Sequence, residues 1–272
     1  MSADSNQIGM AGLVDMVTPA DLCAVIATYN PEESLGHVLR LLQTQVDTVI
    51  LVDNASSTSL CEQLAGSIDL SSFTLVQNAT NRGLAAALNQ GISHARSQGY
   101  SYALVLDQDS EPGNDMVRGL LETLNLARQS TNVVVMGTNF TYYGSGRRFI
   151  DAADTDTPWR TVHSVMTSGS LLDLEIHAKV GGYREDFFVD LVDVEYCLRV
   201  RRYGYTVAVA TQTNMVHAAG APRAHRVLGR TVWTMNHSTQ RAYAMCRNHA
   251  VLLRSYGMNE RAWAIAASWS LC

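Results

Sequence analysis

The chain has 272 residues, of which 47% are hydrophobic and 17% charged, and its formal net charge is −5. This length allows one large domain or a domain with an appendage, and the modest charge gives no indication of nucleic-acid binding. No apolar run approaches the roughly 20 residues of a membrane span, and the N-terminus lacks the basic start and apolar middle of a signal peptide. We therefore expect an intracellular, cytoplasmic protein.

The charge is unevenly distributed along the chain. Between Ala221 and Cys272 there are seven arginines and one acid, Glu260. Such a basic segment suits an anionic ligand or peripheral contact with a membrane surface. A solvated, arginine-rich helix face explains the pattern equally well, so both interpretations stay open.

The first half of the chain alternates between apolar runs and helix-like segments. Residues 1–20 show no periodicity and predict a loose arm. Short apolar runs that end at polar residues predict buried strands within 22–31, 47–57, 73–78 and 102–107, and the segments between them predict helices at 34–45, 59–67 and 83–99. Because the runs are continuous rather than alternating, both faces of the sheet should be covered. The pattern predicts an α/β fold with a mostly parallel central sheet flanked by helices.

The second half is less regular. It predicts a helix at 114–129, a strand at 133–143, a further strand at 206–211 and a mainly helical tail from about Val227. We expect a main domain over residues 21–226, divided into halves at 21–110 and 111–226, and a helical C-terminal segment over 227–272.

Polar residues follow each of the first four predicted strands. In parallel α/β sheets, ligands bind outside the C-terminal strand ends. The residues expected at this rim are Thr28, Tyr29, Asn30, Asp53, Asn54, residues 78–82, Asp107, Gln108 and Asp109. The sequence therefore predicts a ligand site at one edge of the sheet.

Asp107 and Asp109 form a D-x-D pattern at the exit of the fourth strand. Two carboxylates one residue apart can face the same hard cation, and Mg²⁺ or Mn²⁺ prefers oxygen ligands while leaving positions for phosphate oxygens. Such a metal would neutralise a diphosphate leaving group. A surface turn with helix-capping aspartates is the structural alternative.

Three acids, Asp190, Asp193 and Glu195, precede or open a further predicted helix. Acids at a helix start are favoured by the helix dipole, which explains one or two of them without any chemistry.

Together these motifs carry a family resemblance. In order along the chain they are "VIATYNPEESLGHVLRLLQTQ", "VDTVILVDNASS", "NRGLAAALNQGISHA", "ALVLDQDSEP", "GYREDFFVDLVDVEYCLRVRRYGY" and "VHAAG". The segment from about Leu22 to Arg254 resembles inverting family 2 glycosyltransferases of GT-A fold. Within that family it is most similar to bacterial rhamnosyltransferases of surface-polysaccharide assembly.

The resemblance implies a donor site in the half 21–110 and an acceptor site in the half 111–226. Donor-binding residues matched to the family's motifs and the strand ends beside them are Thr28, Tyr29, Asn30, Asp53, Asn54, Asn81, Arg82, Gly83, Asp107 and Gln108. Asp109 would bind the metal directly, and Asp107 would lie beside the metal and face the ribose. His217 matches a histidine that often completes the metal or diphosphate site. A histidine after a strand is also commonly an ordinary hydrogen-bonded residue.

An inverting displacement needs a general base that takes the proton of the acceptor hydroxyl. The family usually has Glu-Asp-x-Asp at this place. Here Val192 stands where the Glu is expected, Asp193 matches the Asp and Glu195 replaces the second Asp. We expect Asp193 to be the base, with Asp190 and Glu195 as the other candidates. Arg247 matches the family's Tyr-x-x-x-Arg-Asn segment and suits a diphosphate.

The resemblance implies transfer of L-rhamnose from dTDP-β-L-rhamnose, with Mg²⁺ or Mn²⁺, to a hydroxyl of a glycan or lipid-linked glycan. The alternatives are another inverting transfer from a UDP- or GDP-sugar and a silent nucleotide-sugar-binding module. The chain shows no G-x-G-x-x-G after its first strand, which argues against a dinucleotide-dependent oxidoreductase. The acceptor and the oligomeric state, including a homo-oligomer, stay open.

Overall fold

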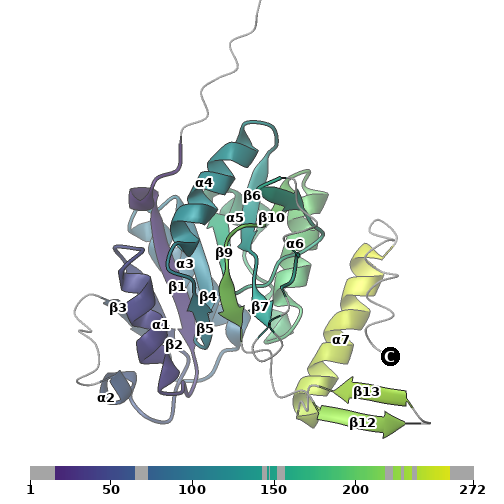
Figure 1. Ribbon diagram of the computed structural model, residues 1–272. Coiled ribbons are helices and arrows are strands. Elements are labelled where there is room, and N and C mark those ends of the chain that lie inside the picture. Colours follow the sequence, from purple (N-terminus) through teal and green to yellow (C-terminus); the bar gives the residue numbers. More distant parts are fainter. Residues whose placement is uncertain are drawn as a thin grey trace, which may run out of the picture.

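The computed structural model describes residues 16–64, 73–142, 146, 148–151, 157–217, 223–227, 230–234 and 238–257. Its centre is an eight-stranded sheet with the order β3-β2-β1-β4-β9-β6-β10-β8 (Figure 1). The strands of this sheet are β1 Leu22–Thr28, β2 Val49–Asp53, β3 Phe73–Gln77, β4 Tyr102–Asp107, β6 Val133–Thr138, β8 Trp159–Thr161, β9 Ser170–Asp173 and β10 Thr206–Ala210. Strands β3, β2, β1 and β4 pair in parallel, as expected, whereas β9 lies antiparallel between β4 and β6.

The helices cover both faces of this sheet. They are α1 Ser34–Gln43, α2 Leu60–Leu64, α3 Leu84–Ser97, α4 Met116–Arg128, α5 Leu174–Val180, α6 Val192–Arg202 and α7 Thr239–Tyr256, with short 3₁₀ turns at Pro19–Asp21 and Glu185–Phe187. Of these, α1 and α4 share one apolar core with Ala24 and Ile26 of β1. Helices α3, α6 and α7 share the other with Cys23 and Val25. Successive residues of β1 thus point into different cores, which explains its continuous apolar sequence.

A three-stranded sheet supports the segment after β4. It has the order β5-β11-β7, with β5 Ser110–Pro112, β11 Met215–His217 and β7 Thr141–Tyr142. The single strand expected over 133–143 is therefore two strands. Asn139 is buried at the corner between them, where its side chain donates to the carbonyls of Ile150 and Thr211.

The C-terminal segment begins differently from the prediction. A hairpin of β12 Arg223–Val227 and β13 Arg230–Thr234 precedes α7, so the prediction of helix from about Val227 is wrong for residues 230–234 (Figure 1). The run Thr231, Val232, Trp233 and Thr234 is β-branched and aromatic, which favours a strand. The expected boundary between 226 and 227 falls inside β12, and the other domain boundaries stay predictions.

Among the described helices, none is long and apolar enough to cross a lipid bilayer.

Candidate active site

The strand register brings the first polar rim residues together. Thr28 pairs with Asp53, and Ala27 pairs with Asp107 on the other side of β1, so the ends of β1, β2 and β4 lie level. Tyr29 lies just beyond and is half exposed. Its backbone N–H donates to Gln108 Oε1 at 2.9 Å, and Gln108 Nε2 donates to the Tyr29 carbonyl at 3.3 Å. Gln108 thus fixes the loop after β1 to the D-x-D segment.

The loop after β2 is held by its own aspartate. Asp53 is buried, and its Oδ1 accepts from the Ser56 hydroxyl at 2.5 Å and the Ser56 N–H at 3.2 Å. The Ser56 hydroxyl in turn accepts from the backbone N–H of Asn30 at 2.9 Å, and the Asn30 side chain accepts from the N–H of Ser57 at 2.8 Å. The loops after β1 and β2 therefore form one hydrogen-bonded edge.

Asn54 organises the segment 81–83. Its Nδ2 donates to Asn81 Oδ1 at 2.9 Å and to the Gly83 carbonyl at 3.1 Å, while its Oδ1 accepts from the Arg82 N–H at 3.0 Å. Asn54 is buried, so these contacts are shielded from water. Sequence predicted Asn54 as a ligand-binding residue. That role stays a prediction, and the structure shows that its amide shapes the loop that opens α3.

Gly83 is required where it stands. Its φ is +84°, and a Cβ built there would lie 2.6–2.8 Å from atoms of Phe188. The next residue, Leu84, donates its N–H to the Phe188 carbonyl at 2.7 Å. The segment 81–83 is thus in direct contact with loop 187–191, which leads into α6 and Asp193.

The D-x-D carboxylates differ in environment. Asp107 lies partly buried at the end of β4, and its backbone N–H donates to Ser168 Oγ at 2.9 Å, whereas Asp109 is exposed. Burial, and then the negative charges of Asp109 and Asp193, raise the pKa of Asp107 to about 7, with Arg241 acting in the opposite direction. Carboxylates that repel one another at the end of a strand fit a hard divalent cation, which would relieve that repulsion.

The backbone of His217 lies next to the residue that follows the D-x-D pattern. It pairs with Ser110 in the antiparallel β5–β11 ladder, one residue beyond Asp109. Its side chain lies outside the described residues. Among the side chains that are described, no group of three or more His, Cys, Asp or Glu could hold a metal ion.

The three candidate bases have three different surroundings. Asp193, near the start of α6, accepts from the backbone N–H of Val194 at 2.8 Å and of Thr167 at 3.2 Å. Burial raises the pKa of its carboxyl, and these backbone hydrogen bonds oppose the shift. Asp190 instead binds the Arg241 guanidinium, with an Oδ1 to Nη2 distance of 2.8 Å and an Oδ2 to Nε distance of 2.9 Å.

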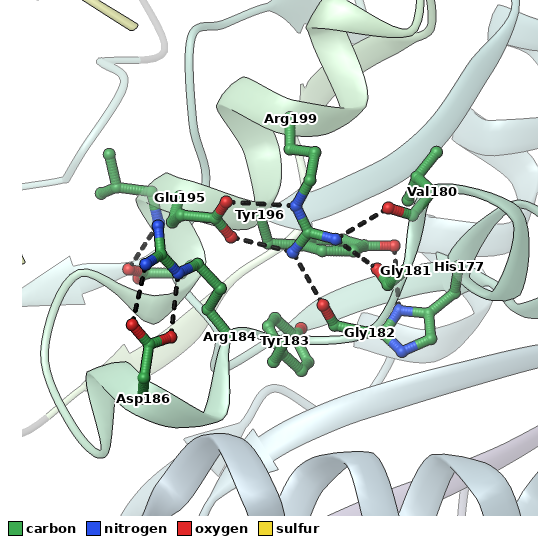
Figure 2. Close-up of polar contacts among 12 residues, drawn as sticks. His177, Val180, Gly181, Gly182, Tyr183, Arg184, Asp186, Glu195, Tyr196 and Arg199 are labelled. Atoms are coloured by element: carbon green, nitrogen blue, oxygen red, sulfur yellow. Dashed lines mark hydrogen bonds and ion pairs between the residues drawn. The ribbon is translucent and has the colours of Figure 1, made fainter. Parts of the chain in front are cut away.

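Glu195 lies in the interior, with 1% of its surface exposed. It accepts from Arg199 at 2.8 and 3.1 Å and from the Tyr256 hydroxyl at 2.8 Å. Arg199 also donates to the carbonyls of Val180, Gly181 and Gly182, as Figure 2 shows. Glu195 therefore joins α6 to α7 and to the turn after α5, a surrounding unlike that of a base open to an acceptor.

Arg247 lies beside the segment 185–191, which carries Glu185, Asp186 and Asp190 and is called the acidic loop below. Its Nη2 donates to the Asp186 carbonyl at 2.6 Å and to Asn248 Oδ1 at 2.8 Å. Two further side chains of α7 contact the same loop: Arg241, which sequence reasoning missed, and Asn248, the Asn of the Tyr-x-x-x-Arg-Asn segment, to which the sequence assigned no role. A second signal for Asn248 was its spacing: it precedes Leu252 and Tyr256 by four and eight residues, which puts a polar side chain on the apolar face of α7.

Comparisons with known proteins identify the family and the fold of the chain. Residues 23–181 match the family model described as Glycosyl transferase family 2. Over 249 residues the chain is 30% identical to the dTDP-rhamnosyl transferase RfbF of Shigella flexneri, an alignment covering 86% of this chain and 80% of the relative.

Similar solved structures include GalNAc-T7 with UDP, GalNAc and Mn²⁺, at a TM-score of 0.62 and 12% identity over 89% of this chain and 49% of that chain. S. aureus TarS 1-349 has a TM-score of 0.55 at 14% identity over 73% of this chain and 60% of that chain. This chain thus spans about half to three fifths of those structures, and at such identities the likeness shows the fold alone. With the family model matched over more than half of its length, the chain belongs to glycosyltransferase family 2 and has a GT-A-like fold.

Proposed function

We propose that this protein is an inverting glycosyltransferase that moves L-rhamnose from dTDP-β-L-rhamnose to a hydroxyl of a bacterial cell-surface glycan or its lipid-linked precursor. The identity to a dTDP-rhamnosyl transferase over most of the chain supports this donor. The observation that carries the chemistry is that the adjacent residues Thr167 and Ser168 bind Asp193 and Asp107, which brings the acid at the start of α6 to the D-x-D segment at the C-terminal edge of the sheet. Asp107 and Asp109 would lie toward the departing diphosphate, and Asp193 would lie toward the incoming hydroxyl.

In the proposed reaction the acceptor oxygen attacks the anomeric carbon of the donor. The bond from that carbon to the diphosphate oxygen breaks, the nucleoside diphosphate leaves, and the hydroxyl proton passes to Asp193. A raised pKa suits a general base that works near neutral pH, and burial raises the pKa of Asp193. Hydrogen bonds from Val194 and Thr167 hold its carboxylate in place.

The surroundings of the other two acids support Asp193 over them. Glu195 is buried and accepts three hydrogen bonds from Arg199 and Tyr256. Asp190 is bound on both oxygens by Arg241. A base must be able to reach the acceptor hydroxyl within hydrogen-bond distance, so both are better suited to holding structure.

On the donor side, we propose that Thr28, Tyr29, Asn30 and Asp53 border the base and ribose. Asn54 and Gln108 fix the loops that shape this site. Asp109 and Asp107 would hold Mg²⁺ or Mn²⁺, whose charge stabilises a departing diphosphate when it is bound. The roles of His217 in that site and of Arg247 toward the diphosphate stay predictions.

The test is transfer from a panel of labelled donors by wild type and Asp193→Asn. We expect wild type to transfer sugar from dTDP-rhamnose. Asp193→Asn should lose this transfer, because a general base contributes roughly 10²–10⁴ to the rate. The nucleotide affinity of the variant should stay within about threefold of wild type. Transfer only from a UDP- or GDP-sugar would refute the rhamnose assignment. Binding without transfer would indicate a silent module, and loss of nucleotide binding in the variant would make Asp193 structural.

We also propose a cytoplasmic location with peripheral membrane contact through the basic C-terminal segment, which would bring the site to a lipid-linked acceptor. Two of its arginines, Arg241 and Arg247, instead face the acidic loop. The remaining basic residues would carry that contact. Self-association into a homo-oligomer stays a prediction.

A further inference from the structure

The loop before α6 has an unfavourable backbone. Phe188, Asp190 and Leu191 have φ values of 62°, 61° and 60°. Residues with a Cβ rarely adopt this left-handed conformation, and they keep it only where the surroundings hold them there. Asp193 follows within two residues of Leu191. The direction in which its carboxylate points therefore depends on whatever holds this loop.

Asn248 of α7 supplies that hold. It has 0% of its surface exposed, and its single amide nitrogen donates to the carbonyls of Phe187, Val189 and Asp190 at 3.1, 3.0 and 3.0 Å. Arg247 donates to Asn248 Oδ1 at 2.8 Å, which directs the amide nitrogen toward the carbonyls. A buried amide with every polar atom engaged is expensive to remove.

The same loop also forms a backbone hydrogen bond to the start of α3, and hydrogen exchange at this bond can report whether the loop stays in place. The Phe188 carbonyl accepts from the N–H of Leu84, the first residue of α3, at 2.7 Å. The segment 81–83 has its own support from Asn54, independent of α7. Release of the loop should therefore break the Leu84 contact while leaving the donor segment in place.

We propose that Asn248 is a positioning residue for sugar transfer: it holds loop 187–191 so that Asp193 faces the acceptor, and it takes no part in nucleotide binding. The inference rests on the proposed function of Asp193. It predicts that loss of Asn248 lowers kcat with little change in nucleotide affinity.

The experiment compares Asn248→Asp and Asn248→Ala with the control Asn132→Asp. Asn132 also donates its amide to a carbonyl, that of Gly204, at 2.7 Å, but it is exposed and lies at the N-terminal ends of β6 and β10, opposite the candidate site. The measurements are kcat, nucleotide Kd and hydrogen exchange at the Leu84 N–H.

For both Asn248 variants we expect kcat to fall about 10²-fold, since a displacement near 1 Å costs about that much. The Kd should stay within about threefold, and Leu84 exchange should rise about tenfold, the effect of losing roughly one hydrogen bond. The control should match wild type in all three. If the Asn248 variants do not fold, Arg247→Ala, which removes a mostly exposed side chain, should still raise Leu84 exchange. For this variant only the exchange rate decides, because Arg247 is also predicted to contact the diphosphate.

Unchanged Leu84 exchange in the folded variants would overturn the proposal, and so would faster exchange with an unchanged kcat. A parallel loss of kcat and nucleotide affinity would also overturn it, because it would mean a general structural role. If wild type transfers no sugar, the proposed function fails, while the exchange measurement still decides whether Asn248 holds the loop.

Discussion

Replacing Glu195 with Gln should destabilise the protein while leaving the chemistry of transfer intact. The Glu195 Oε1 accepts from Arg199 Nε and from the Tyr256 hydroxyl, and Oε2 accepts from Arg199 Nη2. In Glu195→Gln, an amide oxygen at the first position keeps its two donors. The amide nitrogen at the second then faces Arg199 Nη2, so donor meets donor.

The magnitude follows from this geometry. One charge-assisted hydrogen bond, worth roughly 1.5–3 kcal/mol, is lost from a buried pair. The Arg199 guanidinium keeps its hydrogen bonds to the carbonyls of Val180, Gly181 and Gly182. The loss in unfolding free energy should therefore stay below the roughly 3–5 kcal/mol that is lost when one partner of a buried ion pair is removed and the other charge has no partner. We expect about 2 kcal/mol, which for a chain of this size is about 4–8 °C in Tm.

The assay is urea unfolding together with kcat under conditions where the variant stays folded. The expected result is a lower unfolding midpoint and a kcat within about threefold of wild type. Wild-type stability with kcat lowered by 10²-fold or more, the loss expected for a general base, would refute the reasoning and make Glu195 the base.

Two further predictions concern the rim. Burial and neighbouring charges raise the pKa of Asp107 from 3.8 to about 7, so its contribution to stability is fully present below about pH 4 and is lost as the pH rises through about 7. Asp107→Asn should flatten the fall in urea midpoint over that range, and an unchanged slope would contradict the assignment. Gly83→Ala meets both a φ of +84° and Phe188 atoms at 2.6–2.8 Å, whereas Gly99→Ala meets a φ of +91° with nothing within 4 Å. In urea unfolding Gly83→Ala should therefore cost at least about 1 kcal/mol more than Gly99→Ala, and equal costs would mean that the Phe188 loop yields freely.

The sequence was most informative where contacts are local. Continuous apolar runs identify β1, β2, β3 and β4 because both faces of these strands are buried, and parallel pairing then brings their polar ends to one edge. Thr28, Asp53 and Asp107 could be placed at the rim for this reason alone. The antiparallel insertion of β9 between β4 and β6 had no such signal, because it depends on pairing between distant segments.

The roles within the acidic cluster needed the tertiary structure. Asp193 and Glu195 are two residues apart on a helix, so their side chains point in widely different directions and both cannot face the same ligand. Helical periodicity alone could not say which one faces the interior. Arg199 and Tyr256 decide it, and one of them comes from α7, some sixty residues further along the chain.

The fork of Arg199 makes three segments geometrically interdependent. One planar group touches the end of α5, the turn at Gly181 and Gly182, and the carboxylate of Glu195 (Figure 2). A lysine there would reach these oxygens one at a time, since an ammonium cannot span them in a fixed plane. Glu195 also accepts from Tyr256 of α7, so α7 is tied to the same group. Any redesign of this region should therefore keep α5, α6 and α7 together and retain this arginine.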